Sequence, residues 1–531
     1  RAFENVFQVK DTPEGAESDW PVGWQTGTSS ARTALEEMFV RKGYAAEDAP
    51  ELAQRTANLA MGRFSAFKSE GALQKMQQLL QMVVANVPQW VKSDAVRVVA
   101  PSELLSRYLR LLEAVAGRTT YVTLLCQYPR AAERVGRVLA ASRWGTDFVA
   151  SHPIILDELV DGRIREMDDF TPVDWSEWRE RFREALAECG DDQERQMNLL
   201  RDAYHSAVFR LLIADIDGRF TVERLADQLS ALADAVIEET LEIVWRAMAQ
   251  KHCERPKFAV LGYGKLGGKE LGYESDLDLV FLYDDPSDEA DRTYSRLVRR
   301  MISWLTVPTS SGKLFDIDLR LRPNGDSGPI VGSSDMLEEY LYTQGRDWER
   351  FAWLKGRVVS APVFSSAEEF ERASHTVESL VRPFVFRKYL DFGAISSLTK
   401  LHETLRAETA RREAQRSFTG ANVKLGRGGI REIEFITQTL QVIRGGRDVR
   451  LRGKETLPML TRLGEEGVLS PEVAEKLKED YVWLRNVEHA LQYVDDQQTQ
   501  LLPREGENLV HAAALLGVTP EELWAHYEAV R

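Results

Sequence analysis

A glycine-rich turn followed at once by an acidic strand constrains this chain more than any other feature. Residues 258–261 are apolar and stop at Gly262, which predicts a buried strand. The turn after it contains four glycines and two lysines: Gly262, Gly264, Gly267, Gly268, Lys265 and Lys269. Glycine lets the backbone approach a ligand closely and point several N–H groups at it, so this turn favours an anion.

The acidic strand reads Asp276-Leu277-Asp278-Leu279. Strand side chains alternate, so both aspartates share one face and both leucines share the other. Two carboxylates spaced this way lie roughly 6 to 7 Å apart and repel each other, so the pair needs a cation. Mg²⁺ carrying the phosphates of a nucleotide fits best, and we predict metal-assisted nucleotidyl transfer.

A second alternating stretch, residues 311–325, predicts a neighbouring strand. One face is apolar, and the other carries Asp316, Asp318, Arg320 and Arg322. We expect Asp318 to lie beside Asp276 and Asp278, because three carboxylates can hold two Mg²⁺ ions about 3.5 to 4 Å apart. Arg320 and Arg322 would then neutralise a triphosphate.

A dinucleotide-binding (Rossmann) site is the main rival interpretation of the turn. Residues 262–267 fit GxGxxG, and Asp284 follows about 20 residues later. However, the seven residues 269–275 are too few for the helix that crosses over between parallel strands, and the next strand is not continuously apolar. No GxxxxGK[ST] spacing occurs, so a P-loop is excluded as well.

Taken together, the glycine turn, Ser275, the Asp276-Leu277-Asp278 strand and the later Asp318 resemble the nucleotidyltransferase superfamily related to DNA polymerase beta. The longer string GYGKLGGKELGYESDLDLVFLYD, residues 262–284, resembles the glutamine synthetase adenylyltransferase and adenylyl-removing family. In that family, one half of the chain attaches AMP from ATP to a tyrosine of glutamine synthetase. The other half removes the AMP by phosphorolysis and releases ADP.

This resemblance implies roles for particular residues. Asp276, Asp278 and Asp318 would be catalytic metal ligands, and Gly264, Lys265, Gly267, Gly268, Ser275, Arg320 and Arg322 would surround the nucleotide phosphates. A second glycine-rich stretch, residues 424–429, precedes a predicted helix that begins near Ile430. The residues alone leave open a plain tight turn with a helical salt bridge. The resemblance places Arg427, Gly428, Arg431 and Glu434 at the border of the nucleotide or phosphate site.

The resemblance also divides along the chain. Residues 214–218, 262–284 and 309–323 resemble the adenylylating half, whereas residues 325–331, 345–357, 382–392 and 424–438 resemble the removing half. We therefore predict a mosaic of the two halves, which leaves the direction of the reaction open. Glutamine synthetase, a PII-type signal protein and the effector glutamine are the partners that the family implies.

Two other functions fit the same residues. One is a regulatory nucleotide-binding half without catalysis, and the other is a nucleotidyltransferase that acts on RNA or a small molecule. A net charge of −15 argues against a general nucleic-acid binder. The three cysteines, Cys126, Cys189 and Cys253, form no CxxC pair, so the sequence indicates neither disulfides nor a zinc site and suggests a reducing cytoplasm. No run of 18 apolar residues occurs, so we expect no membrane span.

The fold that we predict is mainly α, with one α/β (α+β) nucleotidyltransferase core carrying a small mixed sheet, flanked by helical bundles. The expected domains are a polar arm at 1–29, a helical domain at 30–140, a catalytic domain at 141–365 and a helical domain at 366–531. The sheet core should occupy about 255–335. Helices are expected over 102–116 and 221–252 and from Pro471 onward, where apolar residues recur every three or four positions.

Overall fold

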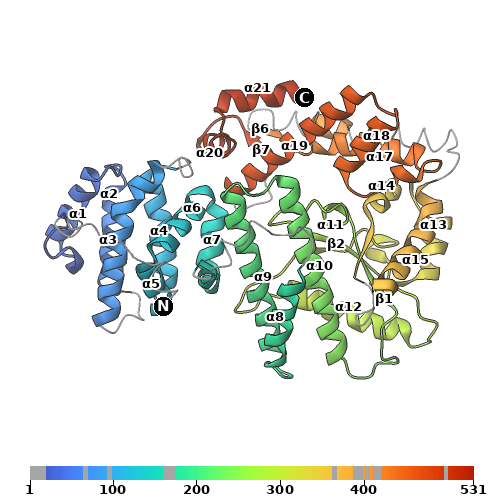
Figure 1. Cartoon of the computed structure of the whole chain (residues 1–531), viewed down its shortest axis with the longest axis horizontal. Coiled ribbons are helices and arrows are strands. Elements are labelled where there is room, and N and C mark those ends of the chain that lie inside the picture. Colours follow the sequence, from blue (N-terminus) through green and yellow to red (C-terminus); the bar gives the residue numbers. More distant parts are fainter. Residues whose placement is uncertain are drawn as a thin grey trace, which may run out of the picture. The chain divides into compact units, whose positions relative to one another are not determined.

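A computed structural model describes residues 19–63, 70–92, 99–159, 175–360, 367–386, 400, 403–404, 406–411, 420–494 and 500–531. Most of the described residues are helical, and one small mixed sheet accompanies them, so the predicted fold class is confirmed (Figure 1). Two compact units divide the chain. The first comprises residues 1–167, 212–217 and 493–496, and the second comprises 168–211, 218–492 and 497–531. The predicted boundary at residue 140 thus lies inside the first unit.

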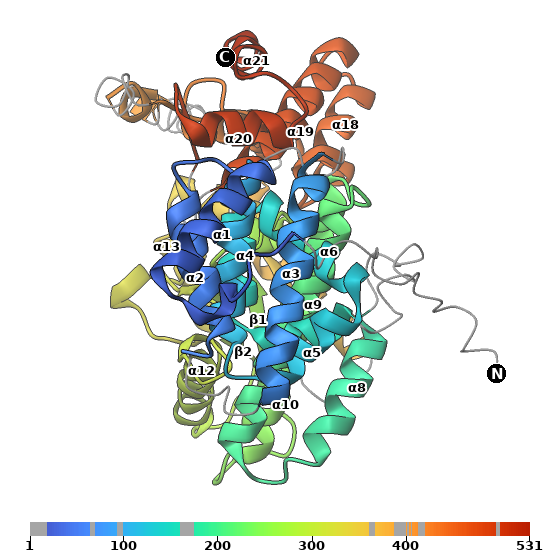
Figure 2. The same cartoon turned by 90° about the vertical axis from the view of Figure 1, so that its left-hand side faces the viewer.

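Helices build the first unit, and they are drawn in blue to cyan in Figure 2. They are α1 (Ser29–Arg41), α2 (Ala49–Ala60), α3 (Glu70–Lys92), α4 (Pro101–Val115), α5 (Thr119–Gln127), α6 (Pro129–Ala141) and α7 (Arg143–Ser151). Helix α4 confirms the helix predicted over 102–116. It begins at a proline that needs no N–H partner, and Leu105, Tyr108, Leu109 and Leu112 are fully buried.

Part of the predicted polar arm is packed rather than extended. Residues 1–18 of the arm lie outside the described residues. Trp20 and Trp24 are buried, with ring centroids 4.4 Å apart, and Trp24 starts the short 3-10 helix η1 (Trp24–Thr26). The predicted arm thus carries two buried aromatic side chains at this end, because large aromatic side chains gain more from burial than from exposure.

The second unit is organised around the sheet. Its strands are β1 (Phe258–Gly262), β2 (Leu277–Tyr283), β3 (Ile317–Asp318), β4 (Gly332–Ser333) and β5 (Arg357–Ser360). The order is β3-β2-β1-β5, with β4 also paired to β2. Strand β1 is antiparallel to both β2 and β5, whereas β2 is parallel to β3 and β4. Antiparallel pairing of β1 with β2 requires no crossover helix, which agrees with the rejection of a Rossmann site.

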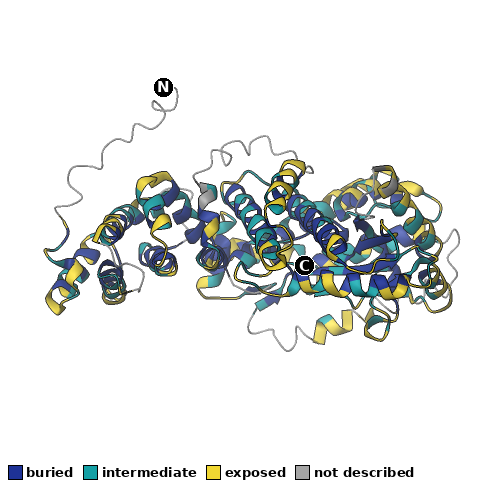
Figure 3. Ribbon diagram, turned by 90° about the horizontal axis from the view of Figure 1, so that it is seen from below, coloured by how far each residue is buried: buried dark blue, intermediate teal, exposed yellow. Residues whose placement is uncertain are grey.

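Further helices of the second unit follow the chain around and beyond this sheet. They are α8 (Ser176–Ala187), α10 (Val222–Ala247), α12 (Ala290–Thr306), α13 (Ser334–Thr343), α14 (Asp347–Lys355), α15 (Ala367–Val385), α17 (Ile430–Arg444), α18 (Thr456–Glu465), α19 (Pro471–Val494), α20 (Glu507–Leu515) and α21 (Pro520–Val530). Helix α9 spans Gln193–Ile216, and β6 (Gly420–Asn422) pairs with β7 (Leu501–Pro503). In Figure 3 many helices show a buried face and an exposed face, as amphipathic helices do.

Helices α10 and α19 begin where the sequence predicts, but α10 ends at Ala247 rather than at residue 252. The loop that follows α10 returns the chain to β1. None of the helices in the described part of the chain is both long and apolar enough to cross a membrane.

A buried arginine fastens α9 to the end of α12. Arg201 is fully buried and donates to three carbonyls there, those of Trp304 at 2.7 Å, Val307 at 2.6 Å and Gly312 at 2.9 Å. Burial lowers the pKa of Arg201 to about 10, which still leaves it charged at neutral pH. This single side chain therefore joins three carbonyls near the end of α12, of which the Trp304 carbonyl accepts it through a buried hydrogen bond.

We expect Arg201→Met to destabilise the second unit by about 3 kcal/mol, because it removes three hydrogen bonds to carbonyls and leaves the buried Trp304 carbonyl without this donor. Urea unfolding of the full chain, followed by circular dichroism, measures this. Arg195→Met changes an exposed arginine on the same helix and should shift the free energy of unfolding by no more than about 0.5 kcal/mol. Equal effects of the two substitutions would contradict the assignment.

Candidate active site

Two parallel strands bring the predicted carboxylates together. Leu277 pairs with Ile317 and Asp278 pairs with Asp318, at the start of β2 and in the whole of β3. Residues paired in this way lie on adjacent strands about 4.8 Å apart, and their side chains point to the same face. The structure therefore places Asp318 directly beside Asp278, as the spacing of the two acidic stretches suggests.

The electrostatics of Asp278 show that all three aspartates share one environment. Burial raises the pKa of Asp278, and the negative charges of Asp276 and Asp318 raise it further, to about 6. Repulsion of this kind favours the binding of a cation between the carboxylates. Oxygen-rich carboxylate groups such as these are the ligands that Mg²⁺ prefers.

The glycine turn lies against the central carboxylate. Gly264 has a φ of +51°, and a Cβ added there would come within 2.3 Å of the Asp278 Oδ2 atom. A side chain at this position would therefore be strained and would also displace the carboxylate. Gly264 is needed where the backbone must pass close to Asp278.

The other predicted turn residues serve the turn itself. The turn is the single-turn helix α11 (Gly264–Gly267), in which the N–H groups of Gly267 and Gly268 donate to the carbonyls of Tyr263 and Gly264. A Cβ on Gly267 would lie 2.0 Å from the Lys355 carbonyl oxygen, so this glycine permits close packing. The Ser275 hydroxyl accepts a hydrogen bond from the Gly272 N–H at 2.9 Å.

The two predicted arginines do not lie on a long strand. Strand β3 contains only two residues, and the chain turns after Asp318, so the alternation predicted through Arg322 was wrong. Arg320 folds back and donates from Nε to Asp318 at 2.8 Å, and these hydrogen bonds lower the pKa of Asp318. Arg322 instead donates to the Leu319 carbonyl at 2.8 Å, within the turn. Asp316 is exposed and pairs with Lys313 at 2.7 Å.

Glu434 belongs to a buried ion network rather than to an open phosphate site. Lys355 Nζ lies 2.9 Å from Glu434 Oε1, and Arg485 lies 3.2 Å from it. The same two cations contact Glu270, at 2.5 and 3.1 Å. Burial alone would raise the pKa of Glu434, but the Lys355 and Arg485 charges overcome burial and lower that pKa. The network joins α17, α14 and α19 to the residues just after α11 (Figure 1).

The network extends to the glycine turn through two further charges. Arg485 contacts Glu488 at 2.7 Å, and Lys265 lies 3.6 Å from Glu488. Burial would raise the pKa of Glu488, but Arg485 and Lys265 lower it to about 2. Lys265 therefore turns toward α19 in this structure.

The second glycine-rich stretch presents a cation near the aspartates. The Lys424 charge lowers the pKa of Asp278 and also that of Glu434, so it acts on both the carboxylate group and the ion network. Arg427 and Arg431 are exposed, and the Gly428 N–H donates to Glu432 at 2.9 Å. Gly428 has a φ of +69°, where glycine is favoured.

A pocket of about 270 Å³ adjoins the network. Its wall includes Lys265, Gly268, Glu270, Arg485 and Glu488. The three aspartates are not among its lining residues, so the pocket and the carboxylate group are neighbouring features of the second unit rather than one cavity.

Sequence reasoning missed several residues of the network. Glu270, Lys355, Arg485 and Glu488 are four of them, and a fifth, Thr456, donates its hydroxyl to Glu270 at 2.7 Å. One usable signal existed: Arg485 and Glu488 lie three positions apart beside the apolar stripe of α19, where buried charges need partners. The partners of Glu270 lie 85 or more positions away, and no local pattern indicates them.

Two parts of the chain match models of known protein families. Residues 132–372 match the family model described as glutamate-ammonia ligase adenylyltransferase, and residues 399–531 match the model described as GlnD PII-uridylyltransferase.

Three relatives share the name bifunctional glutamine synthetase adenylyltransferase/adenylyl-removing enzyme. The protein from Aromatoleum aromaticum is 40% identical over 396 residues, which are 73% of this chain and 40% of its own length. The protein from Chromobacterium violaceum is 34% identical over 500 residues, 94% of this chain and 52% of its own length. The protein from Bordetella bronchiseptica is 34% identical over 507 residues, 92% and 51% of the two chains.

Two of these relatives match more than nine-tenths of this chain, and the chain spans about half of their length. The match to the Chromobacterium violaceum protein runs over 500 residues and about half of that protein. The mosaic of the two halves stays a prediction, and so does the direction of the reaction.

The raised pKa of Asp278 predicts how stability depends on pH. Its pKa of about 6 in the folded chain exceeds the value of about 3.9 expected for an unfolded aspartate. Stability from this group is therefore complete below about pH 3.9 and is lost as pH rises through 6. Without divalent metal, we expect Asp278→Asn to stabilise the second unit at pH 7.5 by about 1 to 3 kcal/mol.

Urea unfolding with a chelator present, at pH 7.5 and pH 5, measures this effect. The stabilisation should be smaller at pH 5, where Asp278 is largely protonated. Asp316→Asn removes a nearby but exposed carboxylate and should change neither value. Destabilisation by Asp278→Asn at pH 7.5 would show that the three carboxylates do not repel one another.

Proposed function

Because the chain belongs to the glutamate-ammonia ligase adenylyltransferase family, we propose that it transfers an adenylyl group between a nucleotide and a tyrosine of glutamine synthetase. Attachment uses ATP, and removal uses phosphate and gives ADP. The relatives carry both activities in their name, and this chain spans half of their length.

The observation that supports the proposal best is the register of β2 and β3. It sets Asp278 beside Asp318, with Asp276 close enough to raise the pKa of Asp278, next to Gly264, where a side chain would not fit. Three converging carboxylates have little use in a folded protein unless a multivalent cation offsets their repulsion.

Mg²⁺ fits this donor set, which is all oxygen and partly exposed. Asp276, Asp278 and Asp318 would hold one or two ions, which would neutralise phosphate charge and lower the pKa of the attacking group. At pH 7.5 Asp278 is mostly ionised even without metal, so the ligands are ready to bind.

Cations of the chain would position the nucleotide phosphates. Arg320 is three-quarters exposed and lies on the solvent side of Asp318, so it can turn from that carboxylate to a phosphate. The Lys424 charge also acts on Asp278, whose pKa it lowers. The buried network of Glu270, Lys355, Glu434 and Arg485 would hold α17 and the glycine turn at a fixed spacing.

Partners follow from the family names. Glutamine synthetase is the proposed target, and the match of residues 399–531 to a PII-uridylyltransferase model supports a PII-type signal protein as a further partner. Glutamine as an effector stays a prediction.

Two incubations test the proposal and determine the direction. The chain is mixed with Mg²⁺, labelled ATP and glutamine synthetase, or with Mg²⁺, phosphate and adenylylated glutamine synthetase. Labelled synthetase in the first, or ADP in the second, supports the proposal. Neither product, with nucleotide still bound, would overturn it in favour of a regulatory module, and labelled RNA or a labelled small molecule would redirect it.

We expect Asp278→Asn and Asp318→Asn to lower the rate of the active direction by at least about a thousandfold, because each removes a metal ligand. Asp316→Asn is the matched control: this aspartate lies two positions from Asp318 but points to Lys313, so the rate should stay within about twofold. Initial rates at saturating Mg²⁺ measure the effect. Similar losses in all three variants, or a full rate in Asp278→Asn, would refute the assignment.

A further inference from the structure

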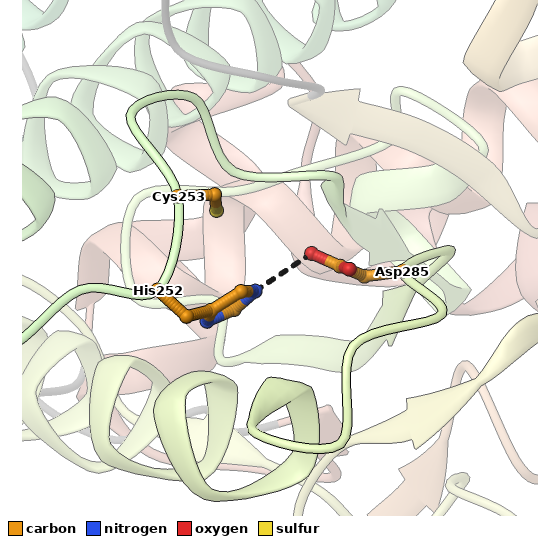
Figure 4. Close-up of side chains that lie close together, drawn as sticks. All are labelled: His252, Cys253 and Asp285. Atoms are coloured by element: carbon orange, nitrogen blue, oxygen red, sulfur yellow. Dashed lines mark hydrogen bonds and ion pairs between the residues drawn. The ribbon is translucent and has the colours of Figure 1, made fainter.

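His252, Cys253 and Asp285 form a compact cluster of three different donor types (Figure 4). His252 and Cys253 lie in the loop between α10 and β1, and Asp285 follows the end of β2. One nitrogen, the sulfur and one carboxylate oxygen all lie within 4.8 Å of one another. In Figure 4 the three side chains converge, and His252 Nε2 lies 2.8 Å from Asp285 Oδ2.

We propose that this cluster binds a transition-metal ion of the zinc class, at a site separate from the three aspartates. Imidazole nitrogen, thiolate sulfur and carboxylate oxygen are the donors that zinc uses in proteins. A soft thiolate disfavours Mg²⁺ and Ca²⁺, which prefer oxygen alone. One thiolate and one carboxylate also balance the charge of a divalent ion, so the loaded site is neutral, as burial requires.

The burial of His252 and Asp285 and the hydrogen bonds to Asp285 indicate that these side chains are held in fixed positions. The side chains of His252 and Asp285 are only 7% and 5% exposed. Asp285 is oriented by the Tyr294 hydroxyl, which donates to it at 2.8 Å, and by the Ser287 N–H at 3.1 Å. Partners of this kind fix the orientation of metal ligands and tune their affinity.

The histidine can become a ligand at small cost. Nδ1 of His252 is buried and has no hydrogen-bond partner among the described residues, so Asp285 provides the ring's one polar contact there. Coordination through Nε2 would replace that contact, with the ring proton carried on Nδ1. The Cys253 thiol would release its proton to solvent as the sulfur–metal bond forms.

Three protein ligands leave a fourth tetrahedral position. Tyr294 Oη lies 3.8 Å from the Cys253 sulfur and 2.8 Å from Asp285, so this oxygen or a water molecule could complete the coordination.

The location of the cluster favours a structural role for the metal ion over a catalytic one. Asp285 lies seven residues beyond Asp278 along and just past β2, which corresponds to roughly 23 Å of extended chain. An ion there would tie the loop after α10 to the far end of the strand that carries the aspartates. The sequence did not indicate this cluster, because it contains no CxxC pair. Its ligands are Cys253, the adjacent His252 and the distant Asp285.

Metal titration of the full chain tests the proposal. After treatment with a chelator, the chain is titrated with Zn²⁺ against a chromophoric chelator, and with Co²⁺ as an optical probe. We expect one tightly bound Zn²⁺ per chain and, with Co²⁺, a thiolate-to-metal charge-transfer band. Cys253→Ser should abolish the band and weaken Zn²⁺ binding by at least about tenfold.

Controls separate this site from the other possible ligands. Cys253→Ser should fold, because the sulfur makes only a 3.8 Å polar contact. Cys126→Ser removes a thiol elsewhere, and Asp278→Asn disables the carboxylate group; both should keep the band and the affinity. Lack of saturable Zn²⁺ binding, a Co²⁺ spectrum without the thiolate band, or binding that Cys253→Ser leaves unchanged would each overturn the proposal.

Discussion

Repulsion between like charges on two paired strands is the constraint on which this structure depends. The β2–β3 register places two aspartates side by side, and a third stands two positions away on β2. A fold does not gain stability from such an arrangement. Burial of Asp278, together with the charges of Asp276 and Asp318, raises its pKa, so keeping this group ionised costs folding free energy. The surrounding apolar strand residues must hold the carboxylates in place, and β1, buried along its whole length, does so from the neighbouring position.

The buried ion network next to the glycine turn has acidic and basic side chains paired with one another, in contrast to the three aspartates. There, Glu270, Glu434 and Glu488 meet Lys355, Arg485 and Lys265, so three acidic groups are matched by three basic ones. Matching makes deep burial tolerable, whereas removal of one member would leave an uncompensated buried charge. The carboxylate group is left short of positive charge, and the network beside it is balanced.

Features that depend on neighbouring residues could be predicted from the sequence, whereas contacts between residues far apart in the chain could not. The buried strand, the glycine turn, the acidic pair and the proximity of Asp318 all follow from spacing and alternation. The extent of β3 did not, because alternation of residue types cannot show where a strand stops being paired, and Arg322 consequently turns to the Leu319 carbonyl. Glu434 was predicted at the border of the nucleotide or phosphate site, but it lies in the buried ion network, because its partners Lys355 and Arg485 come from distant parts of the chain that no local pattern connects.

The ion network also determines what can be cut away. Glu270 and Lys355 flank the sheet, and their counter-charges Glu434 and Arg485 come from helices that the chain makes more than 75 residues later. In a fragment that stops after the sheet, Glu270 and Lys355 would lack their partners Glu434 and Arg485. Such a fragment would also lose the packing of α17 against α14. The sheet and the C-terminal helices are therefore one cooperative folding unit, and synthesis must pass α19 before the glycine turn acquires its final surroundings.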